Sequence, residues 1–263
     1  MPKHIIVASW NVNSLRARQA LVYDWLSRVR PDVLCMQETK VQDSEFPHEL
    51  FKSLGYETVN YGQKSYNGVA ISSLLPMTDV VKGLPDDNEE SQRRVIVATI
   101  AGIRIVNVYI PNGESLSSPK FPYKLDFLTK LDAYLEFIVK GKEPALVCGD
   151  FNIAPADEDV FAPDKLRETV MFHSEEHKHL DYFRKLGFID TFRVLNPEAK
   201  GIYSWWDYRA GALQRNQGYR IDHIWVTSPL DRLCVEVTIE KTEREKDKPS
   251  DHAPVMAEFV RGY

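Results

Sequence analysis

The chain has 263 residues, of which 43% are apolar and 27% charged, with both signs of charge mixed along its length. This composition excludes a disordered protein, and no apolar run approaches the ~18 residues that a membrane-spanning helix needs. The formal net charge is −5, so a polyanionic partner would have to meet a local basic patch, because attraction by the whole molecule is missing. We expect a single domain over residues 1–263 that is monomeric and has no membrane partner.

Short β-rich runs alternate with stretches of helical spacing, which predicts a mixed α/β domain. Alternating runs indicate antiparallel strands with unequal faces, whereas solid apolar runs indicate buried central strands. The expected strands, in chain order, are HIIVASW, DVLCMQ, YETVNY, GVAIS, RVIVATI, RIVNVYI, ALVCGD, RIDHIWV, VEVTIE and PVMAEFV.

Three helices are predicted, each of them covering a sheet. The first runs from about Arg18 to Arg28, and the third from about Glu175 to Leu186, where Gly187 ends it. The second lies in KLDFLTKLDAYLEFIVK, where apolar residues recur at three- and four-residue spacing and predict a core-facing stripe. The members of this stripe are Leu125, Leu128, Leu131, Leu135 and Ile138.

The three cysteines, Cys35, Cys148 and Cys234, are far apart and lie in apolar runs. An odd number of dispersed cysteines does not indicate a disulfide framework, and buried reduced thiols are typical of intracellular proteins. The first residues also lack the apolar core of a signal peptide. We therefore expect a cytoplasmic protein.

Polar side chains stand where several predicted strands begin or end. Residues two apart on an extended segment point to the same side, so Asn11 pairs with Asn13 and Asp150 with Asn152. Hard divalent cations such as Mg²⁺ prefer carboxylate and amide oxygens. The pattern therefore predicts a metal site, whose candidate ligands are Asn11, Glu38, Asp150, Asn152 and Asp251.

The stretch KPSDHAPV adds a histidine, His252, beside one of these carboxylates. No Ser or Cys lies in a context typical of a covalent nucleophile, so water is the expected nucleophile and a phosphodiester the expected target. Asp150 would orient or deprotonate the water, with Asn152 beside it. His252 would contact a phosphate oxygen, and Asp222 in YRIDHIW would hold its other nitrogen.

Several segments carry a resemblance to a known family. They are, in chain order, SWNVNSLRAR, QETK, GVAI, QRR, NVYIPNGES, KFPYK, GDFNIAP, DTFR, SWWDYR, GYRID and PSDHAPV. With them the chain resembles the exonuclease III family of DNA-repair nucleases from about Ile5 to its end. The wider superfamily, which includes DNase I-like nucleases, sphingomyelinases and inositol-phosphate phosphatases, is similar only at the metal motifs.

The resemblance implies a DNase I-like fold, a four-layer α/β sandwich with two central mixed β-sheets flanked by helices. It also implies a Mg²⁺-dependent enzyme, with Mn²⁺ as a possible substitute, that acts in base excision repair. Its substrate would be double-stranded DNA with abasic sites, nicks or blocked 3′ ends. The implied reactions are hydrolysis of the backbone at abasic sites, 3′-5′ exonuclease action and removal of 3′ phosphates.

The resemblance assigns roles to individual residues. Glu38 with Asn11 would bind the metal, and Asp251 would serve the metal or the leaving group. Tyr109 matches the family tyrosine that contacts the scissile phosphate, and the implied roles of Asp150, Asn152, Asp222 and His252 agree with the chemistry above. The implied substrate-binding residues are Arg93, Arg94, Asn112 and Lys120 along the DNA backbone, Trp205, Tyr219 and Ile221 around an extruded sugar, and Arg209 with Arg215 in a groove beside the lesion.

One loop departs from the family pattern. The sequence MFHSEE at Met171–Glu176 stands where the family has smaller residues followed by Thr or Leu and Pro. A bulkier, cationisable His173 near bound DNA would change how the strand is held. The departure favours 3′-end processing over internal cleavage.

Other interpretations remain open at this point. An inositol-phosphate or phospholipid phosphatase would share Glu38, Asp150 and His252, and a catalytically silent DNA-binding module would share the fold. A zinc site at His173, His177 and His179 is an alternative to a solvated helix face. His223 and Trp206 are expected to be packing residues, and the charged run from Glu240 to Lys248 a solvated loop.

Overall fold

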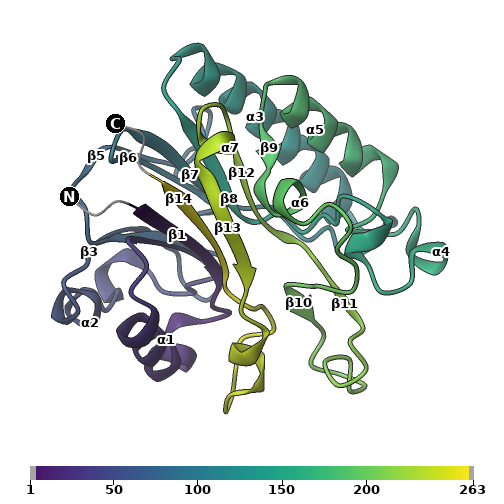
Figure 1. Cartoon of the computed structure of the whole chain (residues 1–263), viewed down its shortest axis with the longest axis horizontal. Coiled ribbons are helices and arrows are strands. Elements are labelled where there is room, and N and C mark those ends of the chain that lie inside the picture. Colours follow the sequence, from purple (N-terminus) through teal and green to yellow (C-terminus); the bar gives the residue numbers. More distant parts are fainter. Residues whose placement is uncertain (1–3, 261–263) are drawn as a thin grey trace.

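The computed structural model of the protein describes residues 4–260. Two six-stranded β-sheets lie face to face, and helices cover the outer face of each (Figure 1). The four layers confirm the predicted DNase I-like sandwich. Within the described residues, no helix is long and apolar enough to cross a membrane.

The first sheet has the strand order β13-β14-β1-β2-β4-β3. β1 and β2 are parallel, and the other neighbours are antiparallel. A parallel pair requires a crossover, which α1 (Leu15–Val29) supplies here. The strands are β1 (His4–Asn11), β2 (Val33–Gln37), β3 (Glu57–Tyr61), β4 (Val69–Ser73), β13 (Cys234–Ile239) and β14 (Val255–Val260).

The second sheet repeats this plan with the order β5-β6-β7-β8-β12-β9. Its parallel pair is β7 and β8, which α3 (Lys120–Lys140) connects. The carboxyl ends of β1 and β2, and those of β7 and β8, therefore point toward one end of the sandwich. The strands are β5 (Met77–Lys82), β6 (Val95–Ile100), β7 (Ile103–Tyr109), β8 (Ala145–Asp150), β9 (Ile189–Asp190) and β12 (Asp222–Val226).

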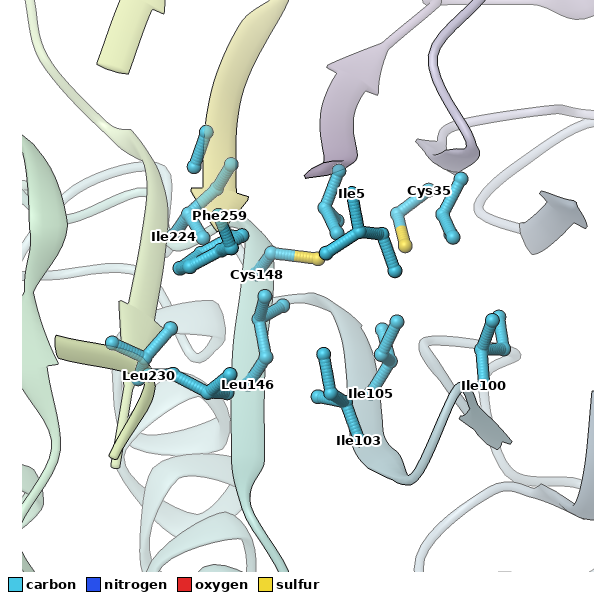
Figure 2. Close-up of a cluster of buried hydrophobic side chains, with 14 of the residues drawn as sticks. Ile5, Cys35, Ile100, Ile103, Ile105, Leu146, Cys148, Ile224, Leu230 and Phe259 are labelled. Atoms are coloured by element: carbon cyan, nitrogen blue, oxygen red, sulfur yellow. The ribbon is translucent and has the colours of Figure 1, made fainter. Parts of the chain in front are cut away.

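Three apolar layers hold the sandwich together. The central one lies between the sheets, where Cys35 and Cys148 reach in from β2 and β8 (Figure 2). The second packs α1 against the first sheet, and the third packs α3 and α5 (Ser174–Lys185) against the second. All three cysteines are buried free thiols, as expected. The remaining helices are α2 (His48–Ser53), α4 (Pro163–Leu166), α6 (Thr191–Leu195) and α7 (Leu230–Leu233), with short 3-10 turns at Asp43–Glu45, Asp157–Asp159 and Lys241–Glu245.

The ten predicted strands and three predicted helices are confirmed, with small shifts of their ends. The edge strand β5 was missed, because its residues are almost all exposed and the bulge at Asp79 breaks its alternation. Three short strands, β9, β10 (Trp205–Trp206) and β11 (Gly218–Tyr219), were also missed because each has only two residues.

The charged run from Glu240 to Lys248 was expected to be a solvated loop, and this is wrong for its centre. Residues Lys241–Glu245 form a 3-10 turn that buries Glu243 and Arg244. Glu243 accepts a hydrogen bond from Arg28 on α1, and Arg244 donates one to the carbonyl of Trp206. The run therefore links α1 to the segment that contains Trp206.

Candidate active site

The carboxyl ends of the two parallel pairs bring the predicted catalytic residues together. In the second sheet, Asp150 at the end of β8 lies opposite Tyr109 on one side and Asp222 on the other. From the first sheet, Asn11 ends β1 and Glu38 follows β2. Residues far apart in the sequence thus meet because both sheets end at the same edge.

Local backbone requirements explain the sequence GDFN at this edge. Gly149 has a φ of 142°, and a Cβ there would lie 1.8 Å from the carbonyl oxygen of Val108. Asn152 has a φ of 51°, which Asn tolerates better than most residues, and its backbone N–H donates to Asp150 Oδ1 at 2.9 Å. Gly149 therefore lets β7 and β8 approach, and the turn after β8 holds the Asp150 carboxylate.

Asn11 joins the carboxylates of the two sheets. Its Nδ2 donates to Glu38 Oε1 and to Asp150 Oδ2, both at 2.9 Å, and its Oδ1 accepts from the backbone N–H of Asn13. Lys40 lies 2.8 Å from Glu38 Oε2. Burial raises the pKa of Glu38, but Lys40, Asn11 and His252 outweigh it and hold the pKa below its usual range. Glu38 is therefore ionised.

His252 lies between two carboxylates, and its contact with Asp222 is the predicted one. Its Nδ1 donates to Asp222 Oδ2 at 2.9 Å, and its Nε2 is 3.7 Å from Asp150 Oδ2. Burial lowers the pKa of His252, but Asp222, Asp150 and Asp251 outweigh it and raise the pKa to about 10. The imidazole thus carries a positive charge at neutral pH, and Asp222 fixes its orientation.

The groups around the buried Asp150 shift its pKa in opposite directions. Burial is the main cause that raises its pKa to about 7, and the neighbouring Asp222 and Glu38 act in the same direction, against His252 and Asn11. A carboxylate whose pKa lies near neutrality is suited to take up and release a proton. The geometry therefore allows Asp150 to act as a general base.

The same residues fit a divalent cation. Ligand atoms of Glu38, Asp150 and His252 lie within 4.8 Å of one another. Because His252 is protonated and bound to Asp222, the donors available to a cation are the carboxylate oxygens of Glu38 and Asp150, a set that hard ions prefer. The protein thus has a site that could hold a metal ion.

The two other predicted ligands are engaged elsewhere. Oδ1 of Asn152 accepts from Asn112 at 2.9 Å. The carboxylate of Asp251 accepts from Trp205 Nε1 at 3.0 Å and from Asn13 Nδ2 at 2.9 Å. Burial raises the pKa of Asp251, but His252 and these two donors lower it below its usual value. The structure therefore sets both residues at the rim of the Glu38–Asp150 centre.

Tyr109 lies next to the centre, with Arg94 against its ring. Burial raises the pKa of Tyr109 well above its usual value, and the charge of Glu38 adds to this. The Arg94 guanidinium stands 4.5 Å from the ring centroid and donates to the Tyr109 carbonyl. Arg94 is only 8% exposed, so it supports Tyr109 from inside, and its contact with a DNA backbone stays a prediction.

The other predicted backbone-binding residues surround the centre at different depths. Arg93 is half-buried, stacks on Tyr61 and donates to its hydroxyl. Asn112 is exposed in the loop after β7, and Lys120 is exposed at the start of α3, 3.2 Å from Glu114. Asn112 is thus the member of this group that hydrogen-bonds to the central residues.

An apolar cluster lies beside the centre. Trp205 on β10 pairs with Tyr219 on β11, and their rings meet edge to face at 5.6 Å. Ile221 is 1% exposed and is a buried member of the same cluster. Arg209 and Arg215 are exposed in the loop between Trp206 and Gly218. The three residues predicted around a sugar are therefore brought together.

The chain is similar to known proteins over nearly its whole length. Residues 8–252 match the model of the Endonuclease/Exonuclease/phosphatase family. The chain belongs to this family. It is 39% identical to exodeoxyribonuclease III of Haemophilus influenzae, over 95% of this chain and 98% of that protein. The predicted resemblance to exonuclease III nucleases is confirmed, and the chain is an enzyme of the nuclease-type hydrolases.

Solved structures agree with this assignment. The 3′-5′ exonuclease NExo of Neisseria meningitidis superposes with a TM-score of 0.95 and 40% identity, over 98% of this chain and 100% of that one. An AP endonuclease of Archaeoglobus fulgidus gives a TM-score of 0.93 and 42% identity, over the same shares of the two chains. An exonuclease and an AP endonuclease are thus about equally similar in fold to this chain.

Two residues at this family site were not among the predicted site residues, although Asn13 had been noted on the same face as Asn11. Lys124 is fully buried behind the centre and donates to the carbonyls of Asn112 and Asn152. Asn13 accepts from Lys40 Nζ at 2.7 Å and donates to Asp251. A signal for Lys124 existed, because it is a lysine on the apolar face of the predicted helix, in line with Leu128 and Leu131.

The histidines outside the centre have structural roles. His223 is buried against Ile153 and Arg220, which confirms the packing role expected for it. The solvated face expected for the other three is wrong, since His173, His177 and His179 are all half-buried. His173 caps α5, His177 binds the Ala154 carbonyl at 2.8 Å and His179 binds Asp132 at 2.6 Å. Since each ring has a different neighbour, zinc binding by the three together receives no support.

Proposed function

We propose that the protein is a Mg²⁺-dependent DNA-repair phosphodiesterase that processes 3′ ends and cleaves at abasic sites. The observation that carries the proposal is the joined set of Glu38, Asn11 and Asp150 with the Asp222–His252 pair beside it. A carboxylate centre next to a cationic imidazole can receive a phosphate together with a divalent ion. The relatives with nuclease names support a DNA substrate.

Each residue has a defined part in the proposed hydrolysis. Asp150, held by Asn11 and by the backbone of Asn152, orients a water molecule and takes its proton. His252 donates a hydrogen bond from Nε2 to a phosphate oxygen, while Asp222 keeps Nδ1 occupied. Tyr109 contacts the same phosphate from the other side, and Arg94 fixes its ring.

The metal has one task in this proposal. A Mg²⁺ ion at Glu38, for which Mn²⁺ can substitute, supplies positive charge to the phosphoryl and leaving oxygens. Glu38 and Asp150 would hold it, with Asn11 between them, and Asn152 and Asp251 would contribute from the rim. Lys40 and His252 keep the Glu38 carboxylate ionised and ready to bind a cation.

The apolar cluster supports an extruded sugar as the group recognised at abasic sites. Trp205, Tyr219 and Ile221 offer aromatic and aliphatic surface, and we expect this surface to accept a deoxyribose without a base and to exclude an intact nucleotide. Extrusion also costs least where base pairing is already lost. Exposed Asn112, Lys120 and Arg209 would contact the DNA around the cluster.

We further propose that His173 shifts the enzyme toward 3′ ends. Its ring packs edge-on against Phe121 at 5.2 Å, and its Nε2 lies 3.3 Å from Glu168, so a bulky side chain is fixed in the loop before α5. A structure named for a 3′ phosphatase, from Neisseria and bound to a product DNA hairpin, has a TM-score of 0.94 to this chain. In His173→Gly, abasic-site cleavage should rise relative to 3′-phosphate release. An unchanged ratio would contradict this role.

The decisive experiment is a substrate panel for the purified protein with Mg²⁺, Mn²⁺ or a chelator. Abasic, nicked and 3′-phosphate duplexes should be hydrolysed with a metal and left intact with the chelator. Hydrolysis of inositol phosphates or phospholipids with abasic and 3′-blocked DNA left intact would establish the alternative phosphatase. DNA binding without hydrolysis of any substrate would establish the silent DNA-binding module.

A further inference from the structure

An ion pair lies inside the protein, directly behind the candidate active site. Nζ of Lys124 on α3 is 2.5 Å from Oε1 of Glu176 on α5, and neither side chain has any exposed surface. Desolvation offsets most of the attraction between two buried charges, so such a pair is weak evidence for stability alone. Its further contacts indicate what else it does.

Lys124 holds two segments of the site. Besides Glu176, its ammonium group donates to the carbonyl of Asn152 at 2.7 Å and to that of Asn112 at 3.2 Å, so its three donors are all used. Asn152 follows the Asp150 carboxylate, and Asn112 lies in the exposed loop after β7. One buried cation thus joins the hydrolytic segment to a loop that faces the substrate.

Glu176 holds a third segment, the loop before α5. Its Oε1 also accepts from the N–H of Met171 at 3.2 Å, and its Oε2 accepts from the N–H of His173 at 3.0 Å. Met171 in turn packs against the apolar cluster of Trp205 and Tyr219. The carboxylate of Glu176 therefore fixes Met171 beside the apolar cluster.

We infer that Lys124 and Glu176 are positioning residues that set the distance between the Asp150–Asn152 segment and Met171 beside the apolar cluster. The pair thereby sets the preference between internal abasic sites and 3′ ends. It touches neither substrate nor metal and acts through Asn112, Asn152 and Met171. The inference rests on the proposed function, because it concerns how that same site distinguishes two DNA substrates.

The helices offer a matched control. Asp132 on α3 binds His179 on α5 at 2.6 Å, at the same helix interface but farther from the site. Its side chain is 16% exposed, as is that of His179, and within residues 4–260 neither side chain hydrogen-bonds to Asn112, Asn152 or Met171. Loss of this contact would loosen the two helices without moving the site loops.

The first test compares Glu176→Gln with Asp132→Asn. A glutamine at 176 has one oxygen and one NH₂ group, so it cannot accept from both Lys124 and the N–H of His173. We expect the ratio of kcat/KM for 3′-phosphate release to kcat/KM for abasic cleavage to change by about tenfold in Glu176→Gln. In Asp132→Asn the ratio should stay at the wild-type value, even if Tm falls.

The second test uses Lys124→Met and Lys124→Arg. Methionine removes the donors, and we expect kcat to fall by about 10²-fold while KM for DNA changes far less, because the reacting groups are misplaced. Arginine restores donors to Glu176 and the two carbonyls and should recover part of kcat. It also keeps the inference testable if the methionine variant folds poorly.

A third measurement does not depend on activity. Amide hydrogen exchange at His173 and at Ala154, which donates to the Met171 carbonyl at 2.7 Å, should accelerate in Glu176→Gln but not in Asp132→Asn. Equal exchange and an unchanged substrate ratio, with an active wild-type enzyme, would overturn the inference. A wild-type protein that hydrolyses none of the DNA substrates would instead overturn the proposed function, and the exchange data would still decide whether the pair positions the loop.

Discussion

Two buried charge clusters lie on opposite faces of β12. Asp222 enters the first, where it binds His252. His223, the next residue, points to the other face and enters the second, where it contacts Arg220. The two clusters contain similar types of buried residue, but they differ in the number of carboxylates relative to cations.

The cluster at His223 is balanced. Arg220 binds Asp159 and Asp190, each at 2.7 Å, and Arg193 binds Asp159 at 2.6 Å, so two cations face two carboxylates. Burial raises the pKa of Asp190, but Arg220 outweighs it and the pKa is lowered. The cluster joins segments around β11 and β12 and has no capacity left for a ligand.

The cluster at Asp222 has an excess of carboxylates. Asp150, Asp222 and Glu38 share His252 and Lys40 as cations, and the pKa of Asp150 rises to about 7, mainly because it is buried. Such an excess destabilises the protein alone but suits a site that receives a cation and moves a proton. The comparison teaches that unbalanced buried charge distinguishes the functional cluster from the structural one.

The largest effect is expected from Asp150→Asn. The change removes the proposed base, so the rate of DNA hydrolysis should fall by about 10³-fold, while DNA affinity stays within about tenfold. Tm should not decrease, because the change removes one negative charge from a cluster that has an excess of carboxylates. Kinetics on an abasic duplex and thermal unfolding measure both, and undiminished hydrolysis would show that Asp150 has another role.

Arg220→Met should have the opposite effect, because it should lower stability rather than the rate of DNA hydrolysis. It leaves Asp159 and Asp190 buried without their main cation, so the free energy of unfolding should fall by about 3–5 kcal/mol. Arg167→Met, which removes an exposed ion pair with Asp157, serves as the control and should leave the free energy of unfolding nearly unchanged, because solvent screens an exposed pair. Urea unfolding measures both. Equal losses would mean that the balanced cluster does not stabilise the fold.

The pH dependence of stability should reveal His223. Burial and Arg220 lower its pKa to about 4, so the unfolded chain takes up the proton first as the pH falls below 6.5. The stability that His223 contributes is therefore present above pH 6.5 and lost between pH 6.5 and 4, by about 3 kcal/mol. His223→Gln can keep both hydrogen bonds without titrating. If urea unfolding shows the same acid dependence for both proteins, the assignment fails.

A smaller effect should come from the metal. Because the Asp222 cluster has excess negative charge, Mg²⁺ should stabilise the wild-type protein, by about 2.7 kcal/mol when its concentration is 100 times Kd. Glu38→Gln should lose most of this gain, and Glu49→Gln, at an exposed carboxylate, should keep it. Thermal unfolding with and without Mg²⁺ measures the difference. Equal gains in both variants would place the ion elsewhere.

Much of the central site was predictable because its residues have local signatures. Glu38 and Asp150 follow solid apolar runs, and Asp222 with His252 occurs in short, specific motifs. The substrate-facing residues were harder to predict, because a motif gives the residue type but not how deeply its side chain is buried. Arg94 and Ile221 were predicted as contact residues, and nothing in the sequence indicated that both are buried, one against Tyr109 and the other in the apolar cluster.

The sequence by itself determined the α/β class, the strand and helix pattern, the family and the centre of the site, since periodicity and strand-end motifs are local properties of the chain. Only the tertiary structure decided that Asn11 joins two carboxylates across the sheets, that Lys124 pairs with Glu176, and that the clusters on the two faces of β12 differ in balance. These features depend on distances and on desolvation between segments far apart in the chain. No local pattern encodes them, because the pKa of a buried group is set by all the charges that the fold brings around it.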